Sequence, residues 1–125
     1  MTARQHARHQ LDPAFKSPIR FSIVACLAGV DETSFARLRD RVEISDATLS
    51  KHAAALEGVG YVKIRKGYLG KRPKTWLSLK AKGRSAFDQH VDALHTIAAG
   101  VDSAELTSTT RQPKAQAAEQ NLRTI

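Results

Sequence analysis

Basic residues are concentrated in one stretch of the sequence, residues 61–84, which contains no Asp or Glu. An exposed surface without a function normally mixes charges of both signs, so a block of one sign indicates a surface that contacts phosphate. The block consists of Lys63, Arg65, Lys66, Lys71, Arg72, Lys74, Lys80, Lys82 and Arg84. The whole chain has a formal net charge of +8, and nucleic acid is the commonest polyanion that such a chain meets in a cytosol. Anionic lipid is the rival polyanion, but it usually requires a basic amphipathic helix, and the sequence shows none.

The sequence contains residue types that bind metals or act in catalysis, but their spacing matches no metal-binding or catalytic motif. The candidate metal cluster is Asp88, His90, Asp92 and His95. A chelate within one helix needs histidines at i and i+4, and these two are five residues apart, so only a site across a dimer stays open. Cys26, the single cysteine, lies on the apolar side of a predicted helix and is expected in the core. The sequence has no Ser-His-Asp order, glycine-rich phosphate loop or CxxC motif, so we expect no enzyme activity, no metal and no cofactor.

Three helices are predicted before the basic block. Ser17 is suited to cap the first, and apolar residues then recur at helical spacing until Gly29. Ser34 is suited to cap a second helix of about eight residues, after a turn at 31–33. A tight connection at 42–44 leads to Ser45, which is suited to cap a third helix that ends at 58–60.

The hydrophobic period then changes from helical to alternating. Val62 and Ile64 alternate with Lys63 and Arg65, which predicts a strand over residues 61–66. A loop is expected at 67–73 and a return strand at 75–79. Because a two-stranded hairpin is not stable alone, we expect it to pack against the helices.

A long last helix is predicted to begin near Lys80. Its apolar residues are spaced by four and three, which is the heptad spacing of a helix seam. That seam and the segment around residues 11–15 predict a dimer interface made of Leu11, Phe15, Phe87, Val91, Leu94 and Ala98. We therefore expect a flexible arm at 1–10, one domain at 11–100 and a mobile tail at 101–125. The predicted class is mainly α with a small β-hairpin and a long C-terminal dimerisation helix.

The order of helix, short helix, tight turn, helix, basic hairpin and long helix is typical of a winged helix-turn-helix. In this arrangement the third helix enters the major groove of DNA, and the hairpin reaches the neighbouring phosphates or minor groove. The candidate DNA-binding residues of the third helix are Ser45, Asp46, Ala47, Thr48, Ser50, Lys51 and His52. Those of the hairpin, or wing, are Arg65, Lys66, Lys71, Arg72 and Lys74.

A series of short motifs supports the same interpretation. It includes Leu11-Asp12-Pro13, Lys16-Ser17-Pro18, Leu49-Ser50-Lys51-His52, Gly60-Tyr61-Val62, Lys71-Arg72-Pro73 and Thr75-Trp76. In this order the motifs resemble those of small prokaryotic winged-helix regulators related to the MarR and ArsR classes. The resemblance covers about residues 11–98 of the chain. It implies a cytoplasmic homodimer that binds operator DNA, usually as a repressor, and has no enzyme activity. Two copies related by a two-fold axis would read a pseudo-palindromic operator.

Two other functions stay open: a winged-helix module that binds proteins, and an RNA-binding protein. Exposed aromatic residues would favour RNA, and only Tyr68 is a candidate, since Tyr61 and Trp76 are expected in the core. For His52 a DNA contact and a half-buried position are equally open. The polar N-terminus and the absence of any apolar run near ~18 residues predict a chain with no secretory signal and no membrane partner. The motifs identify no operator, target gene or small-molecule effector, although an effector is compatible with the resemblance.

Overall fold

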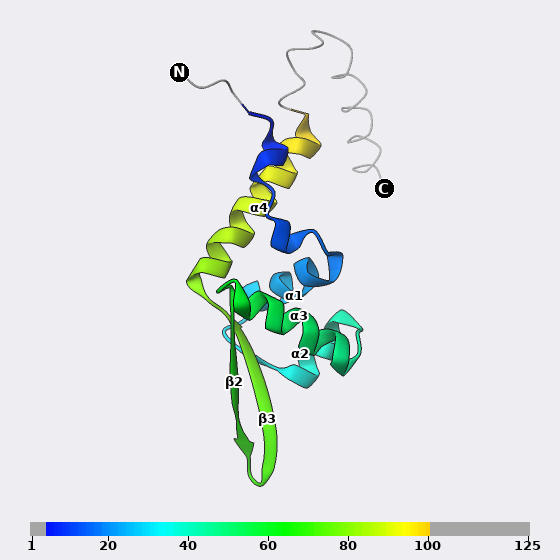
Figure 1. Ribbon diagram of the computed structural model, residues 1–125, viewed down its shortest axis with the longest axis vertical. Coiled ribbons are helices and arrows are strands. Elements are labelled where there is room, and N and C mark those ends of the chain that lie inside the picture. Colours follow the sequence, from blue (N-terminus) through cyan, green and yellow to red (C-terminus); the bar gives the residue numbers. More distant parts are fainter. Residues whose placement is uncertain (1–4, 101–125) are drawn as a thin grey trace, which may run out of the picture.

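A computed structural model describes residues 5–100 of the chain (Figure 1). Its elements in chain order are the 3₁₀ helices η1 (Ala7–Gln10) and η2 (Pro13–Phe15), then α1 (Pro18–Ala28), β1 (Thr33–Ser34), α2 (Phe35–Val42), α3 (Asp46–Gly58), β2 (Val62–Leu69), β3 (Arg72–Leu79) and α4 (Ala81–Ala99). Figure 1 shows α4 and the β2–β3 hairpin projecting from opposite ends of a small helical body. The predicted class, mainly α with a hairpin after the third helix, is confirmed.

The three predicted serine caps begin the first three α-helices. The hydroxyl of Ser17 accepts a hydrogen bond from the backbone N–H of Arg20 (3.3 Å), and Ser34 and Ser45 do the same at the starts of α2 and α3 (both 3.1 Å). Each serine satisfies a backbone donor that the first helical turn leaves without a partner. α2 ends at Glu43, which adopts a left-handed conformation (φ 62°) and turns the chain sharply into α3.

The hairpin is longer than expected. β2 and β3 continue through most of the predicted loop at 67–73 and are joined by only two residues, Gly70 and Lys71. Gly70 has a positive φ of 67° at the first turn position, where type II′ turns favour glycine. The outer half of the hairpin is exposed on both faces, so it lacks the alternation that reveals a half-buried strand. The predicted turn at 31–33 also leads into a short strand, β1, which pairs antiparallel with β3.

The core lies between α1, α2, α3 and the base of the hairpin. Its fully buried side chains include Ile23, Val24, Leu27, Leu38, Leu49, Leu56, Val62 and Leu77. Fully burying one such side chain stabilises the fold by about 1.5–3 kcal/mol. Because Leu49, Ala53 and Leu56 are buried as predicted, the opposite side of α3 faces solvent.

The segment before α1 is part of this body. Phe15 is only 4% exposed and its ring packs against those of Phe21, Tyr61 and Phe87. It therefore lies in the core of its own chain, which differs from its predicted place at a dimer interface. Residues 7–10, expected within a flexible arm, form η1 and pack along α4. Residues 1–4 and the predicted tail at 101–125 lie outside the described residues.

α4 begins at Ala81, close to the predicted start, and buries a different stripe from the predicted seam. Its buried residues are Gly83, His90 and Ala93. Of the predicted seam, Phe87 and Val91 are half-buried, whereas Leu94 and Ala98 are exposed. No helix within residues 5–100 is long and apolar enough to cross a membrane.

Gly83 marks a close approach between α4 and the start of the wing. A Cβ atom at this position would overlap the backbone carbonyl of Tyr61 and a methyl group of Leu79, whereas one at Gly58 would meet nothing within 4 Å. We expect Gly83→Ala to lower the free energy of unfolding by about 2–3 kcal/mol, because rigid backbone cannot move away from the added methyl group. Gly58→Ala, the matched control, should leave it unchanged or raise it by up to about 1 kcal/mol. Urea unfolding measures both; equal effects of the two variants would contradict the close contact.

Candidate nucleic-acid interface

The solvent side of α3 presents small and polar side chains. Ala47, Ser50, Lys51 and Ala54 are all exposed. No side-chain hydrogen bond or ion pair of Ser50 or Lys51 occurs within residues 5–100. Small side chains allow a helix to approach base edges closely, and Ser and Lys supply hydrogen-bonding groups there.

The first turn of α3 is held by bonds within the chain. The Ser45 hydroxyl donates to Oγ1 of Thr48 (2.9 Å), in addition to capping the helix. The carboxylate of Asp46 accepts a hydrogen bond from Nη1 of Arg39 on α2 (2.9 Å), and Arg39 also pairs with Asp40. The Arg39–Asp46 pair links α2 to the first turn of α3 and compensates the negative charge of Asp46.

His52 is half-buried beside α1. Its Nδ1 atom accepts a hydrogen bond from Nε of Arg20 (2.9 Å), so the neutral ring carries its proton on Nε2. Burial lowers the pKa of His52 below its ordinary value of 6.5, and the positive charges of Arg20 and Lys51 lower it further. The ring is therefore neutral at physiological pH, with Nε2–H as its second hydrogen-bonding group.

Two of the five predicted wing cations pack around Trp76. The guanidinium of Arg65 lies 4.0 Å from the centre of the Trp76 ring, and Nζ of Lys74 lies 5.9 Å from it. Arg65 also donates two hydrogen bonds to the carboxylate of Glu32 (2.8 and 3.0 Å). These hydrogen bonds lower the pKa of Glu32. Gly67 leaves room for this packing, because a Cβ atom there would lie 3.2 Å from the Trp76 ring.

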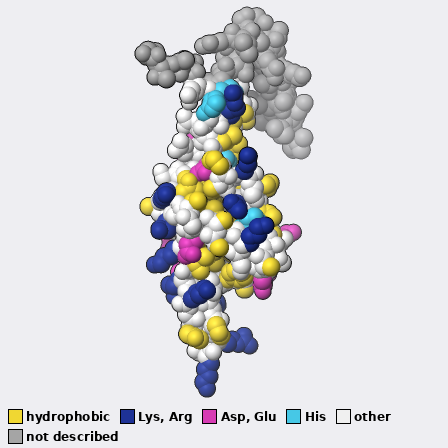
Figure 2. All heavy atoms as spheres, in the orientation of Figure 1, with side chains coloured by type: hydrophobic (Ala, Val, Ile, Leu, Met, Phe, Trp, Pro, Cys, Tyr) yellow, Lys and Arg dark blue, Asp and Glu magenta, His cyan; other side chains and the backbone are white. Residues whose placement is uncertain are grey.

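The residues of the basic block lie in two separate regions of the molecule. Lys66, Lys71 and Arg72 are exposed toward the end of the wing, and Figure 2 shows basic and hydrophobic side chains gathered at this end. At the other end, Nη1 of Arg84 donates to the carbonyl of Ala28 (3.2 Å) and so caps α1. The block is therefore partly a phosphate-facing surface and partly a set of structural contacts.

Comparisons with known proteins agree with this geometry. Residues 19–98 match the family model of a winged helix DNA-binding domain. The chain belongs to this family. The uncharacterized protein MJ0432 of Methanocaldococcus jannaschii is 32% identical to this winged-helix protein over 77 residues, which are 62% of this chain and 84% of the relative.

Two solved structures show the same fold at low sequence identity. A transcriptional regulator homologue from Pyrococcus horikoshii OT3 is 20% identical, with a TM-score of 0.70 over 79% of this chain and 99% of its own. A mutant of MarR from E. coli is 14% identical, with a TM-score of 0.67 over 94% of this chain and 83% of its own. The predicted winged-helix fold is thereby confirmed.

Two residues that complete the winged-helix surface were not predicted as part of it. Arg20 orients His52 from α1, and Glu32 holds Arg65 from the connection before β1. Each pair is separated by more than thirty residues, 32 and 33 respectively, and no local pattern links its members. Only the fold brings these partners together.

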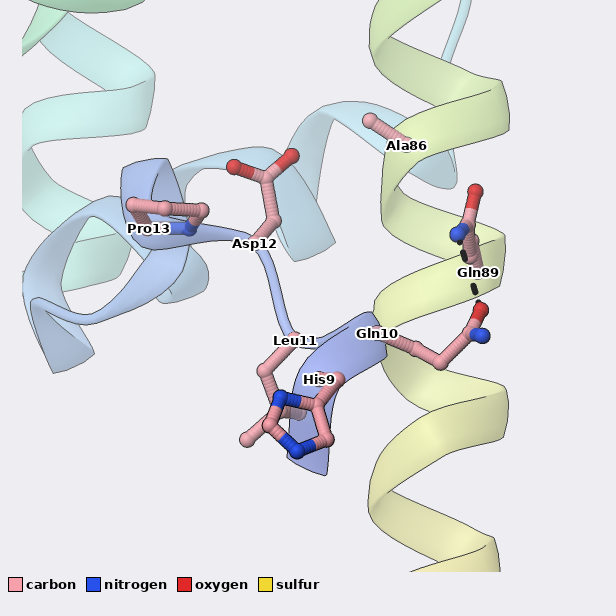
Figure 3. Close-up of a pocket in the computed structure, with 7 residues that line it drawn as sticks. All are labelled: His9, Gln10, Leu11, Asp12, Pro13, Ala86 and Gln89. Carbon is pink, nitrogen blue, oxygen red and sulfur yellow. Dashed lines mark hydrogen bonds between the residues drawn. The ribbon is translucent and has the colours of Figure 1, made fainter. Parts of the chain in front are cut away.

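A pocket of about 370 Å³ lies where the N-terminal segment meets α4 (Figure 3). It is lined by His9, Gln10, Leu11, Asp12, Pro13, Ala86 and Gln89. Figure 3 shows Gln10 and Gln89 reaching toward each other, and the amide of Gln89 donates a hydrogen bond to Gln10 (3.1 Å). The pocket is thus bounded by residues that tie the two segments together.

The histidines and acids of α4 do not form a metal site within residues 5–100, where no three potential ligands cluster. His90 is buried, and its Nδ1 accepts a hydrogen bond from the backbone N–H of Asp12 (2.9 Å). Burial lowers the pKa of His90, while the nearby Asp12 carboxylate raises it in part. Cys26 is half-buried against the core, close to its predicted place.

The His52 geometry predicts an observable protonation state. We expect an NMR titration to give a pKa below 6.5 for His52 and to show the proton on Nε2 above that pKa. Arg20→Gln should raise this pKa only part of the way to 6.5, because burial is the larger cause of the shift. Arg41→Gln on the exposed side of α2 is the charge-matched control and should leave the pKa unchanged. A wild-type pKa above 6.5 would rule out the proposed hydrogen bond.

Proposed function

We propose that this protein is a transcriptional regulator that binds a specific sequence of double-stranded DNA as a homodimer and acts as a repressor. The observation that carries the proposal is the exposed Ser50–Lys51 face of α3 beside a wing that ends in basic residues. These two features belong to a chain of the winged helix DNA-binding family. The proposed role is binding without catalysis, in the cytoplasm where the DNA lies.

In the proposed complex α3 lies in the major groove. Lys51 donates to guanine or to phosphate, Ser50 to a base or a phosphate, and Ala47 contacts a thymine methyl group. Ser45, Asp46 and Thr48 hold the first turn of the helix, as their bonds within the chain suggest. His52 offers its Nε2–H group to a phosphate.

The wing supplies the second set of contacts. Lys66, Lys71 and Arg72 pair with phosphates next to the groove that α3 occupies, which adds affinity without sequence choice. Arg65 and Lys74 act chiefly by packing on Trp76 and so stiffen the hairpin. The bond from Arg65 to Glu32 holds the hairpin against the loop after α1.

Dimerisation is proposed through the part of α4 that leaves the body. Leu94 is 37% exposed and Ala98 is exposed on the same helix, whereas Val91 on α4 and Leu11 before η2 are half-buried. Apolar side chains left exposed together on a projecting helix mark an interface. A two-fold dimer would present two α3 helices to half-sites about 10 bp apart in a pseudo-palindrome. A bound dimer represses by occupying DNA that polymerase requires.

Selection of bound sites from a random duplex pool tests the DNA-binding proposal. We expect the wild-type protein to enrich a two-fold symmetric motif, and Lys51→Ala to relax it at one or two positions in each half-site. A good base contact is worth about 1–3 kcal/mol of discrimination, which is enough to change the selected base. Lys63→Ala, an equal charge loss on the wing, should weaken binding slightly without changing the motif.

The same assay separates the alternative functions. Binding to RNA of equal length in preference to duplex DNA would support an RNA-binding protein instead. Absence of binding to either nucleic acid would favour a winged-helix module that binds proteins. Enrichment of DNA with no symmetric motif would contradict sequence-specific binding by a dimer.

A charge placed in the exposed part of α4 tests the dimer. Leu94→Glu should yield folded monomers, measured by light scattering at tens of micromolar, because an interface cannot bury an unpaired carboxylate without a large cost. Ser85→Glu is the matched control, since it is exposed and lies nine residues away on the opposite side of the helix. A monomeric wild-type protein would contradict the dimer, and a dimeric Leu94→Glu variant would contradict this interface.

A further inference from the structure

His90 on α4 is the only polar residue that is buried within residues 5–100, with 6% of its surface exposed. Its ring contacts the rings of Phe15 and Phe21, at centroid distances of 5.1 and 5.4 Å. Packing accounts for a buried aromatic ring, but a phenylalanine would pack there as well. The ring nitrogens therefore need an explanation of their own, and the proposed function does not use them.

The Nδ1 atom of His90 accepts a hydrogen bond from the backbone N–H of Asp12 (2.9 Å). A backbone N–H can only donate, so Nδ1 must be free of its proton while this bond exists. Protonation of Nδ1 would place two donors against each other and leave the N–H of Asp12 without its acceptor, which is costly away from water. The bond therefore forms only with the neutral ring.

The elements α4, η1 and α1 present no carboxylate to the ring in the described part of the chain. The residues one helical turn from His90 on α4 are all apolar: Ala86, Phe87, Ala93 and Leu94. Asp88 and Asp92 lie two residues away, on another face of the helix, and are exposed. The titratable residues of η1, Arg8 and His9, are exposed as well. The cation of α1, Arg20, is bonded to His52.

The charged group close to the ring is the carboxylate of Asp12. It already accepts hydrogen bonds from the hydroxyl of Tyr61 and the backbone N–H of Ala14. Burial lowers the pKa of His90, and the negative charge of Asp12 offsets this only in part. The ring is therefore neutral at physiological pH and takes up its proton at a lower pH than an exposed histidine.

The bond to His90 is the stronger of two hydrogen bonds that tie the N-terminal segment to α4. η1 packs along the outer part of α4 (Figure 1). Figure 3 shows the other hydrogen bond, from Gln89 to Gln10 (3.1 Å), which joins two exposed, neutral side chains. Water competes for an exposed bond of this kind, so it adds little to the attachment. The buried bond from Asp12 is therefore the main polar anchor of η1.

We propose that His90 is a proton-controlled latch for the N-terminal segment. The neutral ring holds Asp12 and keeps η1 on α4, whereas protonation of Nδ1 breaks this bond and releases residues 7–12. Phe15 stays in the core, because its packing involves no proton. The released ring binds a proton more tightly than the held ring, so the closed state has its full stability above about pH 6.5 and loses stability as the pH falls below it.

Hydrogen exchange of the full chain, followed by NMR, tests the latch at the amides of Asp12 and Leu11. The Leu11 N–H bonds to the carbonyl of Arg8 (3.2 Å) and so reports on η1. The protection factor of both amides should be constant above about pH 6.5 and fall below it by up to about tenfold per pH unit, because opening takes up one proton. The buried residue Leu56 of α3 should keep its protection, since the release is local.

Two variants hold the latch in either state. His90→Asn places an amide oxygen where Nδ1 lies, since both atoms are bonded to Cγ, so the protection should lose its dependence on pH. His90→Phe keeps a ring but has no acceptor, so the protection of Asp12 and Leu11 should be low at every pH. The matched control is His95→Asn, the same substitution at an exposed histidine of α4, which should retain the wild-type behaviour.

Four outcomes would overturn the latch. Wild-type protection that stays constant from about pH 8 to 5 would show that no proton controls the bond. A midpoint above 6.5 would show that Asp12 stabilises the protonated ring. A fall that persists in His90→Asn would assign the titration to another group, and a fall at Asp12 without one at Leu11 would contradict the release of η1. Should His90→Phe fail to fold, the wild type and His90→Asn still decide the test. The experiment uses no DNA, so its result is independent of the proposed function.

Discussion

The arrangement of the molecule depends on the hydrogen bonds of Asp12. Its backbone N–H donates to His90 on α4 (2.9 Å), and its carboxylate accepts from the hydroxyl of Tyr61 at the start of the wing (2.5 Å) and from the backbone N–H of Ala14 (2.9 Å). The hydrogen bond to Asp12, together with burial, raises the pKa of Tyr61 to about 12, so the phenol stays protonated and keeps donating. One residue therefore joins the N-terminal segment, the wing and α4. Because the ring of Phe15 packs against both Tyr61 and His90, a shift of α4 relative to the wing would break polar and apolar contacts together.

Some acidic residues hold cations on the surface of this basic chain. Glu32 holds Arg65 against Trp76, and Asp46 holds Arg39 between α2 and α3. These pairs are exposed, so solvent screens them and they add little to stability. Each pair instead links two elements: the segment before β1 to β2, and α2 to α3. Lys51, in contrast, is exposed and has no acidic partner in the described part of the chain.

Local chemistry made much of the fold predictable. A serine cap depends on residues within three positions of itself, so Ser17, Ser34 and Ser45 were sufficient to place the first three helices. The outer hairpin was not predicted, because Tyr68 and Leu69 are exposed on opposite faces and leave no alternating pattern. The sequence predicts Phe15 at an interface, because no local pattern reveals that its ring packs against Phe87 of the same chain. The candidate site could likewise be predicted only in part. The exposed face of α3 follows from the helical period, whereas Glu32, the partner of Arg65, lies 33 residues away in the sequence and is brought close only by the fold.

The small number of polar groups on α3 explains why a dimer suits the proposed function. Ser50 and Lys51 are the exposed side chains of its middle turn that can hydrogen-bond to bases. At about 1–3 kcal/mol for each contact, one copy would discriminate between sequences by roughly 2–6 kcal/mol. Specific DNA-binding proteins typically prefer their sites by about 4–10 kcal/mol over other DNA, so a single copy reaches only the lower part of this range. Two copies related by a two-fold axis double the discrimination to about 4–12 kcal/mol, which spans the range of specific binding. In the proposed dimer, specificity would therefore depend on the connection from α3 through the core to α4 as well as on the residues of α3 that face the bases.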